Sequence, residues 1–317
     1  MLIEALKAFF IGVVEGITEW LPISSTGHMI LVDEFVKLNV SAEFLELFLV
    51  VIQLGAIMAV LILYFHKLNP FSPRKTRVQK HATWRLWGMV AIGCIPAAAI
   101  GLTLDDFFNE YFYNAWTVAI ALIVYGVVFI VLEQRNRRRE AVYLESHRVG
   151  ARSVRGRHAR PVYEVGPGDD GDNAEQALFR VHTVDEIDWK TALKIGCFQM
   201  LAIIPGTSRS GSTIIGGMLC GCSRTAAAEF TFFLAIPVMF GWGVLKLIKY
   251  VLAVGMAMTA TEIVVLAVGI VTAFVVSVIA IKFLMGYIKK NDFTAFGVYR
   301  IIVGLVVLAY FGAKLFL

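Results

Sequence analysis

The chain contains few of the residues that build metal centres, disulfide frameworks or nucleotide sites. It has only 4 cysteines in 317 residues, and no Cys/His pairs stand at zinc-finger spacing. We interpret the cysteines as free thiols buried in or beside apolar segments: Cys94, Cys197, Cys220 and Cys222. No Walker-type glycine-rich loop and no set of protein-kinase motifs occurs, so nothing in the sequence indicates a nucleotide substrate.

Hydrophobic residues are abundant instead. They make up 58% of the chain, against about 45–50% in an average soluble domain. The excess lies in six blocks, each close to the ~20 residues that a helix needs to span a bilayer: residues 44–65, 84–104, 115–132, 226–245, 263–281 and 301–317. An earlier apolar run contains Glu15 and Glu19 and lacks the pattern of a cleavable signal peptide. We therefore predict an all-α, polytopic integral membrane protein.

The net charge of +5 does not indicate nucleic-acid binding, because of where the cations fall. Most of the 29 Lys and Arg residues lie in three segments, 67–85, 135–194 and 282–300. If each apolar block crosses the membrane once, these segments share one side. The positive-inside rule then places them in the cytoplasm. The C-terminus at Leu317 is predicted to lie on the opposite side.

Two short polar runs interrupt apolar stretches, at residues 22–28 and 205–213. Each lies between two helix-like segments. Broken backbone is tolerated at membrane depth only where it is buried in protein or lines a polar cavity. Arg209 alone would cost about 2.5–3.5 kcal/mol at the centre of a spanning helix. We predict that the two runs together form the functional site.

The second half of the chain repeats the layout of the first. Leu21-Pro22 before a Ser/Thr/Gly run corresponds to Ile204-Pro205 before another. Each half is predicted to contain one re-entrant, broken-helix hairpin and three transmembrane helices. An odd number of crossings makes the halves inverted repeats, an architecture known from transporters. The alternative, two ordinary spans in place of each hairpin, conflicts with Pro, Gly, Ser and Arg in mid-segment.

These patterns divide the chain into three regions. Residues 1–133 form the first membrane repeat and residues 189–317 the second. Residues 134–188 have mixed charge and no apolar periodicity, which predicts a cytoplasmic linker, largely disordered.

Glu15 and Glu19 stand four residues apart and share one face of a helix. Two buried carboxylates repel each other unless a cation lies between them. An oxygen site of this kind suits a divalent ion such as Mg²⁺. An ion pair between a glutamate and Arg209, without metal, is the alternative, and both arrangements are compatible.

The other polar residues favour phosphate chemistry. Ser25 and His28 follow Glu19 closely, and His28 is a candidate general base, nucleophile or donor. The second run adds a guanidinium suited to bidentate phosphate contact and hydroxyls at a helix start, where free N–H groups favour anions: Ser208, Arg209, Ser210 and Thr213. Gln53 lies within a span and is a candidate supporting residue, whereas Glu229 is more consistent with a structural role.

The two runs in their context resemble signature motifs of the undecaprenyl-diphosphate phosphatases, also called bacitracin-resistance proteins. The first is EGITEWLPISSTGH at residues 15–28, and the second is PGTSRSGST at residues 205–213. VIQLG at 51–55 and AEF at 228–230 also match the family pattern. The resemblance covers nearly all of both halves. The segment 136–183 departs from it, because it is longer than is usual in the family.

The resemblance implies a multi-pass enzyme of the bacterial plasma membrane whose active site opens to the extracytoplasmic face. Such an enzyme hydrolyses undecaprenyl diphosphate to undecaprenyl phosphate and inorganic phosphate. This recycles the lipid carrier for peptidoglycan synthesis, supports cell shape and confers bacitracin resistance. A divalent cation, Mg²⁺ or Ca²⁺, is implied as cofactor. The partners implied are the polyprenyl diphosphate lipid and membrane lipid, without nucleic acid. The oligomeric state stays open, a homodimer included.

The resemblance also assigns roles to residues. Glu15 and Glu19 would serve metal binding or proton transfer, and Ser25 and His28 would act at the attacked phosphorus. The diphosphate would be held by Ser208, Arg209, Ser210 and Thr213, with Arg209 also stabilising charge in the transition state. Gln53 is counted with these substrate-binding residues as a supporting side chain. The attacking group stays open between Ser25, His28 and an activated water.

Other functions fit the sequence less well. A transporter or lipid flippase would also use inverted repeats, so hydrolysis in detergent is the distinguishing observation. The type-2 phosphatidic-acid phosphatase class needs a late Ser-Arg…His motif, and no histidine follows Arg209. A membrane scaffold would not need Glu15, Glu19, His28 and Arg209 at membrane depth.

Overall fold

The computed structural model describes residues 1–153, 178–255 and 258–314, and within them the regular secondary structure is helical, without a named strand. Six helices are long and apolar enough to cross a membrane. They are α3 (Ala42–Leu63), α5 (Arg77–Phe112), α6 (Ala115–Ser153), α10 (Arg224–Val254), α11 (Ala260–Ile288) and α12 (Thr294–Lys314). Each contains most of one predicted apolar block, so the all-α, multi-span prediction is confirmed.

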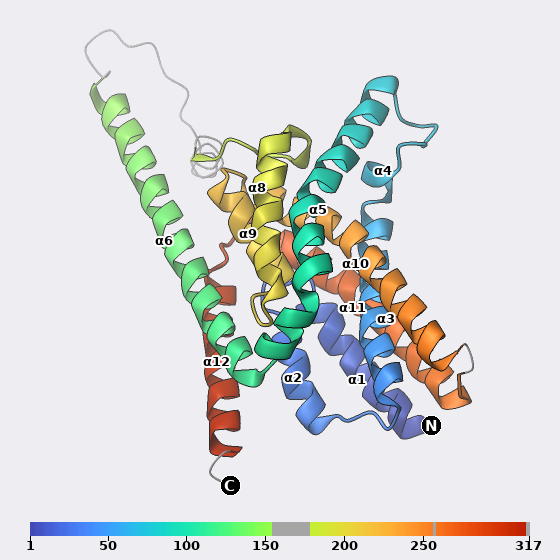
Figure 1. The fold of residues 1–317 in the computed structure, drawn as a ribbon. Helices are drawn as coiled ribbons and strands as arrows, with labels where there is room; N and C mark the ends of the chain where they lie inside the picture. Colours follow the sequence, from blue (N-terminus) through green and yellow to red (C-terminus); the bar gives the residue numbers. More distant parts are fainter. Residues whose placement is uncertain (154–177, 256–257, 315–317) are drawn as a thin grey trace.

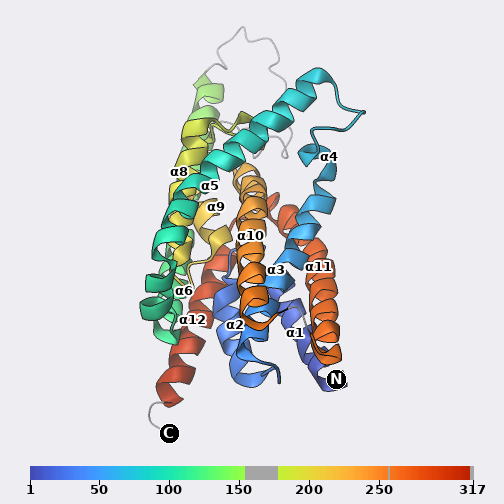
Figure 2. The same cartoon turned by 45° about the vertical axis from the view of Figure 1, so that its right-hand side comes forward.

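Four shorter helices form two hairpins that enter the molecule from opposite ends and meet near its middle (Figures 1 and 2). The first hairpin consists of α1 (Leu2–Thr18) and α2 (Ser25–Phe35). The second consists of α8 (Trp189–Met200), the 3₁₀ turn η2 (Leu201–Ile203) and α9 (Arg209–Leu219). The two polar runs predicted as the functional site fall at the connections between these arms.

Similar local chemistry makes both breaks. Pro22 and Pro205 lack a donor and disfavour helix in the residue before them. A serine then caps the next helix: the Ser24 hydroxyl accepts from the Gly27 N–H (3.3 Å), and that of Ser208 from the Gly211 N–H (3.1 Å). Both capping serines have positive φ, 73° and 71°, which no other non-glycine residue in the described ranges has. Such backbone costs about 1–3 kcal/mol per residue and occurs preferentially at functional sites.

The helices pack across the two halves of the chain. Helix α1 lies on α11 and α8 lies on α5, while α6 packs on α12 and α3 on α10. The first arm of each hairpin thus lies against a long helix of the other half. A two-fold relation between the halves would give this exchange of partners, and their inverted orientation in a membrane stays a prediction.

Small residues allow the first arm of each hairpin to pack closely against a long helix of the other half. A Cβ added at Gly16 would lie 2.8 Å from both the Ala273 carbonyl and the Val276 Cβ of α11. In the second hairpin, a Cβ at Gly196 would collide with the Gly93 carbonyl of α5. Small residues at helix interfaces serve the same purpose in membrane bundles generally.

The segment predicted as a linker begins as helix. Helix α6 continues through the basic residues 135–139 to Ser153, and residues 154–177 lie outside the described part. The chain then forms the 3₁₀ turn η1 (Val184–Glu186), and Asp188 caps α8 by accepting from the Thr191 N–H (2.8 Å). A short helix, α4 (Phe65–Leu68), joins α3 to the loop before α5.

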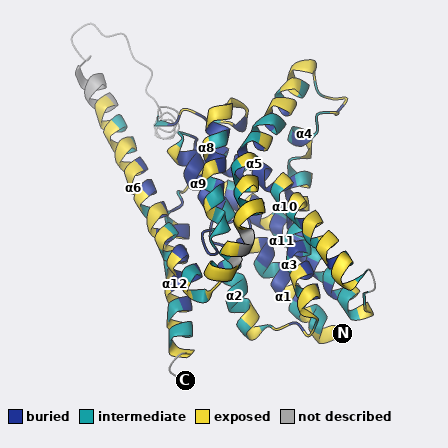
Figure 3. Cartoon of the chain, viewed as in Figure 1, coloured by how far each residue is buried: buried dark blue, intermediate teal, exposed yellow. Residues whose placement is uncertain are grey.

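Buried residues gather where the two hairpins meet the long helices, as Figure 3 shows in dark blue. The larger hydrophobic core contains fully buried side chains of α3, α6 and α10, including Ile57, Phe129 and Phe230. Among the cysteines, Cys222 is buried as expected, but Cys197 is exposed on α8.

We expect Gly16→Leu to destabilise the fold, because the new side chain would separate α1 from α11. Overpacking of this kind costs about 1–3 kcal/mol. Gly241→Leu is the matched control, since a Cβ at this position of α10 meets no atom within 4 Å. Thermal midpoints of the purified proteins in detergent provide the measurement, and equal midpoints for the two variants would contradict the close packing of α1 on α11.

Candidate active site

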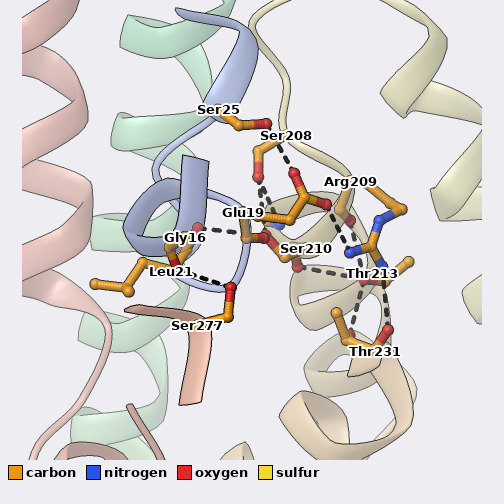
Figure 4. A network of polar contacts seen from close by, with 11 residues as sticks. Gly16, Glu19, Leu21, Ser25, Ser208, Arg209, Ser210, Thr213, Thr231 and Ser277 are labelled. Atoms are coloured by element: carbon orange, nitrogen blue, oxygen red, sulfur yellow. Dashed lines mark hydrogen bonds and ion pairs between the residues drawn. The ribbon is translucent and has the colours of Figure 1, made fainter. Parts of the chain in front are cut away.

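An ion pair joins the two hairpins at the centre of the molecule (Figure 4). The Arg209 guanidinium, on the first residue of α9, donates from Nη2 to Glu19 Oε1 at 3.0 Å. Its Nη1 donates to the Thr231 carbonyl of α10 at 3.1 Å. The two charged side chains are only 13% and 9% exposed. Breaking such a buried pair by removing one partner leaves an uncompensated charge, which is strongly destabilising.

Hydroxyl groups surround this ion pair. The Ser25 hydroxyl donates to Glu19 Oε2 at 2.9 Å, so both oxygens of this carboxylate have partners. The Ser210 hydroxyl lies within hydrogen-bond distance of the Glu19 and Leu21 carbonyls and of the Ser208 hydroxyl (3.1 Å). The breaks in the two hairpins are therefore held together by one continuous polar network.

A cavity of about 170 Å³ opens beside the network. Its polar lining comes from three helices and two connections: Glu19, Ser25, Thr26, Gln53, Ser208, Arg209 and Ser210. Met239 and Trp242 of α10 supply apolar wall. Gln53 makes no hydrogen bond with the described residues, so its amide is available to a bound molecule. Six of the residues predicted from sequence are thus brought to one cavity.

Glu15 and Thr213 lie behind the cavity rather than in its lining. Thr213 is fully buried; its hydroxyl donates to the Arg209 carbonyl (2.9 Å) and accepts from the Thr231 hydroxyl (2.8 Å). Glu15 is 2% exposed, one helical turn before Glu19, and interacts electrostatically with Glu19 and Arg209. Thr213 therefore supports the helix that carries Arg209.

The carboxylate pair fits a divalent cation. Glu15 Oε1 is buried and has no hydrogen-bond partner among the described residues. With all groups ionised, Glu15 and Glu19 carry one more charge than Arg209 balances. Oxygen donors with excess negative charge are what Mg²⁺ or Ca²⁺ binds, usually with substrate phosphates as further ligands. Within the described residues, no group of three or more His, Cys, Asp or Glu side chains could form an all-protein metal cage.

His28 lies one turn after Ser25 but outside the cavity lining. Its Nδ1 is 2.7 Å from the Ser24 carbonyl, and its Nε2 is 2.8 Å from the Tyr299 hydroxyl of α12. The two rings stack with centroids 5.6 Å apart. Both ring nitrogens therefore have partners, and His28 binds the capping residue of α2 in this arrangement.

Arg300 is a central residue that the sequence analysis missed and counted among the cytoplasmic cations. It is fully buried in α12 and donates to the carbonyls of Pro22 (3.1 Å), Gly206 (2.9 Å) and Thr207 (2.9 Å). No carboxylate among the described residues pairs with it, and its guanidinium lies 5.4 Å from the centroid of the Tyr125 ring. One side chain thus satisfies carbonyls of both broken hairpins.

The arrangement can accommodate an anion beside a hydroxyl that is hydrogen-bonded to a carboxylate. Arg209 and the N-terminal turns of α2 and α9 present positive charge and N–H groups to the cavity. The Ser25 hydroxyl, hydrogen-bonded to a carboxylate that Arg209 orients, has the geometry of an activated nucleophile. These groups suit the transfer of a phosphoryl group, whose charge spreads over several oxygens.

A family model described as bacitracin resistance protein BacA matches residues 8–306. The chain belongs to this family. Among its relatives, the undecaprenyl-diphosphatase of Desulfitobacterium hafniense is 52% identical over 314 residues, 99% of this chain and 98% of the relative. That of Enterococcus faecalis is 51% identical over 304 residues, 96% of each chain. The resemblance drawn from the two polar runs is confirmed.

The comparison with these BacA relatives also bears on the linker. Alignments that cover nearly all of both chains mean that these relatives are about as long as this protein. The segment at residues 136–183 therefore does not set this chain apart from them in length. The expectation that this segment is longer than is usual across the whole family stays a prediction.

We expect Arg300→Met to lower both stability and activity. The substitution leaves three hairpin carbonyls without their donor, and each unsatisfied buried group costs about 1–3 kcal/mol. Arg300→Lys should recover part of the loss, because an ammonium can still donate to some of them. Thermal midpoints and hydrolysis rates of the three proteins in detergent test this. A midpoint for Arg300→Met equal to that of the wild type would contradict the role of Arg300 as a shared donor.

Proposed function

We propose that this protein hydrolyses undecaprenyl diphosphate to undecaprenyl phosphate and inorganic phosphate. The observation that carries the proposal is the Glu19–Ser25–Arg209 constellation in one cavity, in a chain about half identical to undecaprenyl-diphosphatases over nearly its full length. The activity returns the lipid carrier to peptidoglycan synthesis. It thereby supports cell shape and confers resistance to bacitracin.

The cavity residues hold the diphosphate of the substrate. Arg209 presents its guanidinium to the phosphate oxygens, because its fork matches them in geometry. The N–H groups at the start of α9 and the hydroxyls of Ser208 and Ser210 add donors, and Gln53 contributes its free amide. The apolar wall formed by Met239 and Trp242 accommodates the first part of the prenyl chain.

We infer that Ser25, rather than His28, attacks the terminal phosphorus. Its hydroxyl lies 2.9 Å from Glu19 Oε2, which takes the proton as the oxygen–phosphorus bond forms and the bridging P–O bond breaks. Undecaprenyl phosphate leaves as a good leaving group, and water then hydrolyses the phosphoserine. Arg209 holds Glu19 in place and stabilises the charge that develops on the transferred group. A water attacking directly beside Ser25 is the alternative.

A divalent cation, Mg²⁺ or Ca²⁺, completes the site in this proposal. Glu15 and Glu19 would hold it together with substrate phosphate oxygens. When bound, it supplies positive charge that offsets the diphosphate and the unbalanced carboxylate. The unpartnered Glu15 oxygen supports this assignment.

The protein is proposed to lie in the bacterial plasma membrane with its site open to the extracytoplasmic face. The support is the distribution of charge. Two basic segments, the loop between α3 and α5 and the end of α6, lie at one end of the molecule, and the first hairpin (α1 and α2) lies at the other (Figure 1). The positive-inside rule assigns that basic end to the cytoplasm. Dimer formation is not required, since one chain supplies every group of the constellation.

Purified protein should release phosphate from undecaprenyl diphosphate in detergent, and EDTA should suppress the release. Arg209→Ala should reduce the rate by about 10²-fold or more, because a charge-stabilising group is lost. Colorimetric phosphate detection provides the measurement, with circular dichroism as control for folding. Absence of release by folded wild type with added Mg²⁺ or Ca²⁺ would favour a lipid carrier instead.

Ser25→Ala should abolish turnover if Ser25 is the nucleophile, whereas Ser25→Thr, which keeps the hydroxyl, should retain a measurable part. The rate of Glu19→Gln should fall to about that of Ser25→Ala, because removing either member of a pair that acts as a unit abolishes the same step. Single-turnover rates measure these effects. A rate for Ser25→Ala within tenfold of wild type would point to direct attack by water.

A reporter fused after Leu317 should be active outside the cytoplasm. Six crossings place the C-terminus on the same side as the N-terminus, opposite the basic loops. A phosphatase that folds only outside the cytoplasm, compared with a fluorescent protein that folds only inside, gives the measurement. A cytoplasmic signal at the C-terminus would reverse the proposed orientation.

A further inference from the structure

A second cavity, of about 290 Å³, lies at the end of the molecule that carries the loop between α3 and α5. It is formed by α4, that loop, the first turns of α5 and the turn η1. It shares no residue with the active-site cavity. A single buried water needs only about 10–15 Å³ of such space, so the cavity has room for a group larger than water.

Cations dominate its lining. Lys67, Arg74 and Lys75 line it together with His66, and Asp185 is the acidic residue among the lining side chains. Lys67 is paired with Glu229 of α10 at 3.1 Å. Arg74 and Lys75 have no ion pair with any described residue, although Asp185 attracts Lys75 electrostatically. The cavity therefore keeps positive charge that the protein does not neutralise.

The Lys75 ammonium is held in place by neutral oxygens. It donates to the Lys67 carbonyl at 2.9 Å and to the Thr83 hydroxyl at 2.7 Å. An ammonium has three donors, so one N–H is left for a bound group. Holding a lysine by two neutral acceptors fixes its charge at the cavity without cancelling it.

The surrounding backbone is also fixed. The Trp87 indole donates to the Leu68 carbonyl at 2.9 Å, and Thr76 and Gln79 form a reciprocal capping box at the start of α5. The Thr83 hydroxyl donates further to the Gln79 carbonyl at 3.0 Å. The backbone around the cavity and the Lys75 side chain are therefore held by the fold, and Arg74 adds an exposed guanidinium to the lining.

We propose that this cavity binds a phosphate monoester group. A guanidinium and an ammonium that are not neutralised favour a compact anion of high charge, and arginine matches phosphate oxygens in geometry. In the orientation proposed above, this end of the helices faces the cytoplasm, where basic pockets between spanning helices bind lipid headgroups. A lipid whose headgroup is a phosphate monoester and free inorganic phosphate share this chemistry.

The test measures ligand affinity in detergent with the active-site cavity disabled by Arg209→Gln. In that background, R74Q/K75Q is compared with R77Q/K80Q, which removes the same charge from neighbouring residues outside the lining. The probes are phosphatidic acid, a monoester; phosphatidylglycerol, an anionic diester; and inorganic phosphate. R74Q/K75Q should weaken binding of the monoester about tenfold or more, and R77Q/K80Q should not. Arg74→Gln alone serves if the double variant does not fold, because its exposed side chain forms no hydrogen bond with the described residues.

The comparison of the three probes identifies the source of the ligand. Binding of phosphatidic acid that inorganic phosphate does not displace assigns the cavity to a lipid headgroup, and displacement at low concentration assigns it to the phosphate group itself. Equal weakening by both double variants, or equal binding of monoester and diester, would overturn the proposal in favour of diffuse surface charge. With Arg209 intact, R74Q/K75Q should release phosphate at the wild-type rate in detergent, so failure here leaves the proposed hydrolysis untouched.

Discussion

Backbone that leaves the helix at membrane depth must find its hydrogen bonds within the protein, and the rest of this structure depends on that constraint. Two connections break the helical ladder in the middle of the molecule. Their carbonyls cannot rely on bulk water. Arg300 donates to three of them, and the hydroxyls of Thr207 and Ser210 donate to others. The polar network therefore supplies hydrogen-bond donors to backbone carbonyls that would otherwise lack them, and the same groups form the site.

The same breaks create the chemistry. Ending one helix and starting another in apolar surroundings exposes N–H groups that favour an anion, and the capping serines hold the new helix starts at positive φ. Glu19 lies where α1 ends and Arg209 where α9 begins, so their ion pair joins the two breaks directly. Neither hairpin has both halves of the pair, and the cavity therefore exists only when the hairpins meet.

Local sequence carried much of this information. Apolar blocks of the right length predicted the six spans, and polar residues in otherwise apolar runs located the two connections and most of the cavity lining. Local pattern could not place residues whose partners are remote in the chain. Arg300 was assigned to a basic cytoplasmic segment because its neighbours in sequence suggest one, yet its acceptors lie 278, 94 and 93 residues away. The length of α6 was missed for a different reason: its charged end has no apolar periodicity, so no pattern in the sequence indicated that the helix continues to Ser153.

Arg300 also sets an order of events in the making of the protein. It belongs to α12, the last of the helices in the described residues, whereas the Pro22 carbonyl that it satisfies belongs to the first hairpin. During synthesis the first hairpin enters the membrane long before its donor exists. Its connection has to wait for this donor until α12 has been translated. A chain whose synthesis stops before α12 would thus contain every residue of the cavity lining. It would lack Arg300, the side chain that binds the connections of both hairpins.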